Sequence, residues 1–142
     1  SRIKIFDDKG LGFNIIDHNY EGSHFGHICQ VKLGTDAVNF RDGKTGQFKN
    51  EIHKLKKQGA SKKEIGKLIK GTKYKFKHDL SADEWHDVSI YFKDDTIKLF
   101  VDDEYITEFA SEGFDHDTKQ TLALSVWGKA QIDYVKVWEL DQ

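Results

Sequence analysis

The clearest alternation of polar and apolar residues in the chain lies between residues 85 and 109. In its first part, Val88, Ile90 and Phe92 share one face with His86, and the residues between them point to the other face. A period of two predicts a strand, because successive side chains of a strand point to opposite faces. Acidic pairs at 94–95 and 102–103 supply turns, and the alternation resumes after each. The segment therefore predicts two antiparallel strands and the start of a third.

Similar patterns occur on both sides of this segment. The other predicted strands are residues 2–6, 12–17, 27–33, 37–41 and 72–77, together with the alternating stretches on either side of Gly128 within 121–140. Residues 2–6 and 12–17 are expected to form a hairpin around the turn at 7–10. The chain thus predicts about nine strands in all.

The pattern changes to a helical one in the middle of the chain. Phe48, Ile52 and Leu55 fall at i, i+4 and i+7, which predicts an amphipathic helix. Ser61 and Glu64 have the spacing of a capping box, which predicts the start of a second helix. We therefore expect a helical hairpin inserted between strands, over about residues 47–70.

These elements predict an all-β fold, an antiparallel two-sheet jelly-roll sandwich with an inserted helical hairpin, in one domain over residues 1–142. Strand-like sequence begins at the first residue, and a jelly roll would have one or two more strands before it. We expect a processed or truncated chain whose sheet is completed by an N-terminal segment or by a partner chain, because 2–6 would otherwise leave an open edge. No apolar run approaches the length of a membrane span.

Charge is distributed unevenly along the chain. Residues 44–77 contain twelve Lys and two Glu, a local charge of +10, whereas the rest of the chain carries −12. The basic segment fits an anionic partner: a sulfated or uronic polysaccharide, nucleic acid, or the acidic face of another subunit. Nucleic acid is the weakest of these, because the chain contains no base-reading motif. The alternative is a solvated helix face that protects a sheet edge.

Three motifs resemble a known family. They are Glu84-Trp85-His86-Asp87-Val88, the hairpin sequence of residues 98–103, and the closing sequence Asp-Tyr-Val-Lys-Val-Trp of residues 133–138. They resemble the concanavalin A-like jelly rolls, and within them the bacterial 3-keto-disaccharide hydrolase-like domains, long known only as a domain of unknown function. The resemblance covers most of the chain except the helical hairpin. It implies a carbohydrate-related role and a secreted protein, extracellular or periplasmic, and its motifs specify the fold better than the chemistry.

The densest group of polar residues is the loop of residues 17–27. It holds the candidate ligand-binding residues Asp17, His18, Asn19, Tyr20, His24 and His27. Amide, carboxylate and imidazole groups can bond sugar hydroxyls while an aromatic ring stacks on the sugar. Imidazoles can also act as general bases or hold a metal, and a purely structural loop is the third interpretation.

Two further sites are predicted near the end of the chain. Trp127, which precedes a turn, is the tryptophan that we expect to contact a ligand, whereas Trp85 and Trp138 occupy core-type positions. Asp133 corresponds to an acidic residue that, in related glucanase-type jelly rolls, helps to hold Ca²⁺, so the resemblance implies a calcium site there.

The lone Cys29 lies in strand-like sequence and is expected to be a buried apolar residue.

Two functions follow from these observations. One is a carbohydrate-binding module with a glycan on the concave face of a sheet; if it is also an enzyme, a glycoside hydrolase-like activity is expected. The other is a non-catalytic interaction module, docked into a larger assembly through an open sheet edge and the Lys-rich hairpin.

Overall fold

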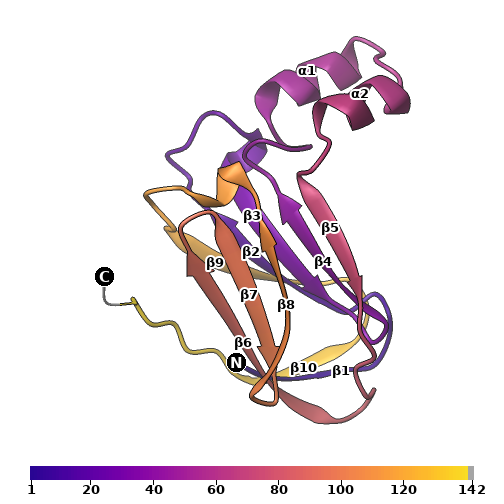
Figure 1. Ribbon diagram of the computed structural model, residues 1–142, viewed down its shortest axis with the longest axis vertical. Coiled ribbons are helices and arrows are strands. Elements are labelled where there is room, and N and C mark those ends of the chain that lie inside the picture. Colours follow the sequence, from indigo (N-terminus) through magenta and orange to yellow (C-terminus); the bar gives the residue numbers. More distant parts are fainter. Residues whose placement is uncertain (141–142) are drawn as a thin grey trace.

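The computed structural model describes residues 1–140 as two antiparallel five-stranded sheets packed face to face (Figure 1). Sheet I has the order β10-β1-β6-β7-β8 and sheet II the order β5-β4-β3-β2-β9. The strands are β1 (Arg2–Ile5), β2 (Leu11–Ile16), β3 (His27–Leu33), β4 (Ala37–Asp42), β5 (Lys73–Lys77), β6 (Trp85–Lys93), β7 (Thr96–Val101), β8 (Glu104–Ala110), β9 (Thr121–Val126) and β10 (Ala130–Tyr134). The predicted two-sheet sandwich is confirmed.

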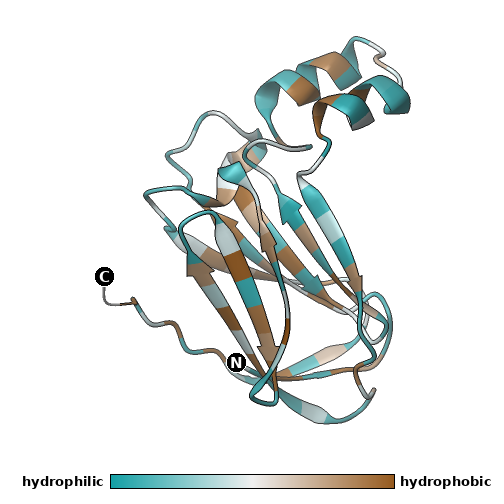
Figure 2. Ribbon diagram, in the orientation of Figure 1, coloured by the Kyte–Doolittle hydropathy of each residue, from teal (hydrophilic) through white to brown (hydrophobic). Residues whose placement is uncertain are grey.

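The core lies between the two sheets and is built from the alternate positions of each strand. Ile97 and Leu99 of sheet I and Phe13 of sheet II are buried members of this one core. Figure 2 shows the alternation of hydrophilic and hydrophobic residues along the strands. Burial of one such side chain contributes about 1.5–3 kcal/mol, so the period of two seen in the sequence has a direct energetic cause.

The meander predicted between residues 85 and 109 is present as β6, β7 and β8, with consecutive strands paired. Asp94, Asp102 and Asp103 adopt positive φ angles of 52°, 51° and 66° in its turns. Asp tolerates this left-handed backbone better than most residues, which explains why acidic pairs occupy both turns.

The predicted helical hairpin is also confirmed. It consists of α1 (Asn50–Lys57) and α2 (Lys62–Leu68), between β4 and β5. The capping box at Ser61 and Glu64 is formed. Ile52, Ile65 and Ile69 form a small core that is separate from the core of the sandwich. The hairpin accordingly projects from one end of the two sheets (Figure 1). Two short 3₁₀ turns, η1 (His24–Gly26) and η2 (Glu112–Phe114), complete the fold.

The first strand differs from its predicted place. Residues 2–6 and 12–17 do not form a hairpin, because β1 lies in sheet I and β2 in sheet II. Strand β1 is not an open edge either, since it pairs with β10 on one side and with β6 on the other. Its neighbours come from distant parts of the sequence, and local pattern cannot indicate such a pairing.

Two tryptophans differ from prediction as well. Trp85, expected in the core, is 39% exposed, and its ring lies under the charged groups of Arg2 and Lys4 at 5.9 and 5.2 Å. Trp138 is 71% exposed on the extended segment after β10. Cys29, in contrast, is buried as predicted.

Candidate functional site

The outer face of sheet II carries many polar side chains. Its side chains alternate with core residues such as Val31 and Phe40, so they point away from sheet I. Strand register places them in two rows across the sheet. One row is Lys75, Asn39, Lys32, Gly12 and Ser125, and the next is Lys73, Arg41, Gln30, Asn14 and Ala123.

Part of this face is hollowed. A depression of about 500 Å³ lies over β3, β4 and β5, a volume within the range of small-molecule binding sites. It is lined by Asp8, Gln30, Lys32, Asp36, Asn39, Phe40, Arg41, Lys73, Tyr74 and Lys75. Amide and cationic groups dominate this list, which suits a polar ligand.

A hydrogen-bonded network orients the polar groups beside the depression. The Nδ2 group of Asn14 donates to Ala123 O at 3.1 Å and to Ser125 Oγ at 2.9 Å. The Nε2 group of Gln30 donates to Asn14 Oδ1 at 2.6 Å. Asn14 is only 2% exposed. The network therefore holds the side chains of Gln30 and Ser125 in fixed positions on the outer face.

Trp127 forms an aromatic platform next to these rows. A Cβ atom at Gly12 would lie 2.5 Å from two atoms of the Trp127 ring, so the ring can lie over this position because glycine has no side chain. The Nζ atom of Lys32 lies 5.2 Å from the ring centroid, within range of a cation–π interaction. The ring is nevertheless 46% exposed. The structure thus places a half-exposed aromatic ring beside fixed amide groups, and contact of Trp127 with a ligand stays a prediction.

The loop of residues 17–27 lies at the opposite end of β2. Trp127 is bonded to Gly10 just before that strand, through its backbone N–H, whereas Asp17 follows the last residue of the strand. A strand of six residues rises about 3.3 Å per residue. The predicted ligand-binding residues therefore fall into separate groups at the two ends of sheet II.

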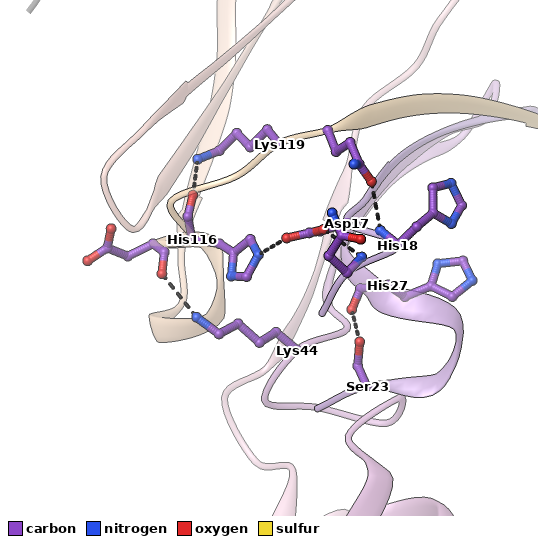
Figure 3. Close-up of polar contacts among 10 residues, drawn as sticks. Asp17, His18, Ser23, His27, Lys44, His116 and Lys119 are labelled. Carbon is purple, nitrogen blue, oxygen red and sulfur yellow. Dashed lines mark hydrogen bonds and ion pairs between the residues drawn. The ribbon is translucent and has the colours of Figure 1, made fainter. Parts of the chain in front are cut away.

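Asp17 holds its end of the sheet together (Figure 3). Its Oδ2 atom lies 3.0 Å from His116 Nε2, and its Oδ1 atom accepts a 2.9 Å bond from the backbone N–H of Asn19. The hydrogen bond to His116 is the main cause that lowers the pKa of Asp17. Tyr20 packs edge-on against His116, with ring centroids 5.0 Å apart. Asp17 and Tyr20 thus have structural contacts, and His116 is a partner that the sequence analysis did not identify.

The histidines of this loop pack against different partners. His24 stacks on His53 of α1 at a centroid distance of 4.7 Å, and His27 stacks on Phe48 at 4.8 Å. Burial, followed by the proximity of His24, lowers the pKa of His27. The rings of His18 and His27 point away from Asp17 (Figure 3), and His18 and Asn19 are exposed at the rim.

The predicted calcium ligand Asp133 is an exposed residue of β10. Across residues 1–140, no group of three or more His, Cys, Asp or Glu side chains has the proximity needed to hold a metal ion. None of the helices described is long and apolar enough to cross a membrane.

Asp42 is a further polar residue that the sequence analysis did not single out. It is fully buried at the end of β4, and its carboxylate accepts hydrogen bonds from Thr45, Ser111 and the backbone N–H of Gly113. These contacts satisfy the carboxylate and connect β4 to η2. Asp42 therefore has a structural role.

Comparison of the chain with protein-family models, curated proteins and solved structures found no match.

Proposed function

We propose that this protein binds a carbohydrate on the outer face of sheet II. The observation that favours this most is the position of Trp127, whose half-exposed ring lies over Gly12 beside the hydrogen-bonded network of Asn14, Gln30 and Ser125. A sugar ring has an apolar face of C–H groups and an equatorial rim of hydroxyls. The ring of Trp127 can stack on the apolar face, and the fixed amide and hydroxyl groups can form hydrogen bonds with the hydroxyls of the rim.

The resemblance of three motifs to concanavalin A-like jelly rolls supports the same proposal. From this resemblance we also propose that the protein is exported by a bacterium. His18 and Asn19, exposed at the far end of sheet II, extend it to a glycan long enough to reach that rim. The proposal concerns binding; a glycoside hydrolase-like activity would be an addition to it.

The test compares two tryptophan variants on a panel of immobilised neutral and acidic glycans. Trp127→Ala should lose at least about fivefold in affinity for any glycan that the wild type binds, because stacking on an aromatic ring is worth roughly 1–3 kcal/mol. Trp138→Ala is the matched control, since Trp138 is also exposed but lies on the segment after β10. Equal binding by wild type and Trp127→Ala, or no binding of any glycan by the wild type, would contradict the proposal.

A second candidate function is that of an interaction module, and the flank formed by β9 and β10 favours it. Each of these strands has a paired neighbour on one side only, β2 and β1 respectively, in the described part of the chain. Val126, Ile132, Val137 and Trp138 are exposed along this flank and on the segment that follows it. Open edges with apolar side chains are templates for another strand.

This second proposal retains the expectation that a partner chain or an N-terminal segment completes the sheet, with the Lys-rich hairpin as an additional contact. Native mass spectrometry over a range of concentrations tests it, with Val137→Lys to disrupt the flank. Loss of an assembly in that variant would support docking through this edge, and a wild type that is monomeric at all concentrations would argue against self-association.

A further inference from the structure

The cations on the outer face of sheet II have a distinctive environment. Lys32, Arg41, Lys73 and Lys75 line the depression, and only two acidic residues, Asp8 and Asp36, line it with them. None of the four cations forms an ion pair with any of residues 1–140. Elsewhere in this chain, cations near carboxylates do pair, as Lys98 does with Glu108 across two strands.

Register explains why these charges converge. Arg41 is paired with Lys73, and Asn39 with Lys75, so like charges lie directly opposite or diagonal to each other on neighbouring strands. Like charges placed opposite each other on neighbouring strands destabilise a sheet. Arg41 is also partly buried, and burial lowers its pKa from its ordinary value, although an arginine remains charged at neutral pH. Repulsion among these cations is unfavourable, and a bound anion would relieve it.

The positive surface continues beyond the sheet. Strand β5 follows the helical hairpin in the sequence. The hairpin projects from the end of sheet II at which β5 begins (Figure 1). Exposed lysines continue along α2 and into the turn after it: Lys62, Lys63, Lys67 and Lys70. None of these four is ion-paired within residues 1–140. A ligand that leaves the depression in this direction therefore meets further unpaired positive charge.

We infer that the glycan recognised by this face is a linear anionic polysaccharide, sulfated or uronic, which lies across the depression and continues onto α2. This inference rests on the proposed carbohydrate-binding function. Trp127 and the network of Asn14, Gln30 and Ser125 contact the sugar rings, and the four cations contact sulfate or carboxylate groups. Arginine and lysine are the side chains that pair best with such groups.

Nucleic acid is the competing polyanion, and the face is less suited to it. Proteins that bind single strands stack successive bases on several aromatic side chains. Trp127 lies over this outer face, whereas Phe40 and Tyr74, which also line the depression, occupy inward-facing positions and pack against Phe109. The amide and hydroxyl groups of Asn14, Gln30 and Ser125 fit the hydroxyl-rich rim of a sugar better than they fit a nucleic-acid base.

The test uses three double variants that each remove two positive charges. Lys73→Gln with Lys75→Gln alters the depression, and Lys62→Gln with Lys63→Gln alters α2. Lys93→Gln with Lys98→Gln is the matched control on sheet I. The probes are heparin and oligogalacturonate fragments of several lengths, an uncharged cello-oligosaccharide series, and a single-stranded DNA of the same charge, titrated by calorimetry at low and high NaCl.

The anionic fragments should bind, and their affinity should fall as salt rises, because salt screens exposed charges. The depression variant should lose roughly fivefold to tenfold in affinity for all anionic fragments, which corresponds to about 1–1.4 kcal/mol for the two exposed charge contacts together. The α2 variant should lose affinity only for long fragments, and the control should change less than about twofold.

Other outcomes distinguish a failure of the anionic specificity from a failure of carbohydrate binding. If uncharged fragments bind as tightly as anionic ones and the depression variant is unaffected, the anionic specificity is wrong and carbohydrate binding stands. If no glycan of either kind binds, both fail. If DNA of equal charge binds more tightly than any glycan, the face recognises nucleic acid and the inference is overturned.

Discussion

The Nδ1 atom of His86 lies 2.7 Å from the Oδ2 atom of Asp102, and the Nε2 atom of the same ring lies 3.0 Å from the carbonyl oxygen of Ser81. A carboxylate and a carbonyl can only accept hydrogen bonds, so both ring nitrogens must donate and His86 is held as the imidazolium. The other carboxylate oxygen of Asp102 accepts the backbone N–H of Asp87. One ion pair thus connects the start of β6, the β7–β8 turn and the loop before β6.

This contact predicts a decrease in stability with rising pH. Burial is the largest effect on His86 and lowers its pKa, but the hydrogen bonds to Asp102 and Ser81 and the negative charges of Asp102 and Glu84 raise it, and the net shift is upward. A raised pKa in the folded state contributes stability that is fully present below the unfolded value of about 6.5 and is lost as pH rises through the folded value. The free energy of unfolding, measured with urea from pH 6 to pH 9, should fall across this range.

The matched variant is Asp102→Asn, because Asn also tolerates the positive φ of 51° at this position. It should lower the free energy of unfolding by about 1.5–3 kcal/mol at pH 6, the worth of a hydrogen bond to a charged group, and much less at pH 9. A variant with the same slope against pH as the wild type would show that another group causes the dependence.

Gly12 is predicted to control the position of Trp127. Gly12→Ala would place a Cβ atom 2.5 Å from the ring, and the ring must move because it is the exposed and flexible partner. We expect a shifted indole N–H resonance for Trp127 and weaker glycan binding, with a nearly unchanged Tm. An unaltered indole resonance in Gly12→Ala would mean that the ring does not lie over this glycine in solution.

Cys29 is predicted to be unreactive in the folded protein. The side chain is 2% exposed, and burial raises the pKa of its thiol to about 12. Since the thiolate is the reactive form, a chromogenic disulfide reagent should label Cys29 only after urea unfolds the chain. Rapid labelling under native conditions would indicate that β3 opens far more often than this burial implies.

The helical hairpin is predicted to unfold separately from the sandwich. Ile65 packs with Ile52 and Ile69 in a cluster that has no buried residue in common with the main core. Ile65→Ala should therefore raise hydrogen exchange over residues 50–69 while leaving β6 and β7 protected. Leu99→Ala, in the main core, should instead lower global stability by about 2–5 kcal/mol. Uniform deprotection in Ile65→Ala would show that the two cores unfold as one.

The sequence by itself determined the features that depend on neighbouring residues. The β6–β8 meander, its acidic turns, the capping box at Ser61 and the burial of Cys29 all follow from local periodicity, turn chemistry and side-chain size, which act over a few residues. For the same reason, the alternating lysines of residues 73–77 were recognisable as one face of a strand.

Only the tertiary structure decided what those faces meet. Strand β1 acquired partners from β6 and β10, more than 80 residues away, and the pairing of β5, β4, β3, β2 and β9 brought Lys75, Lys32 and Ser125 into one row. The same register put Trp127 and Asp17 at opposite ends of sheet II. Strand order is set by the burial of whole sheet faces and not by any one segment, so the site on sheet II could not be assembled from the sequence alone.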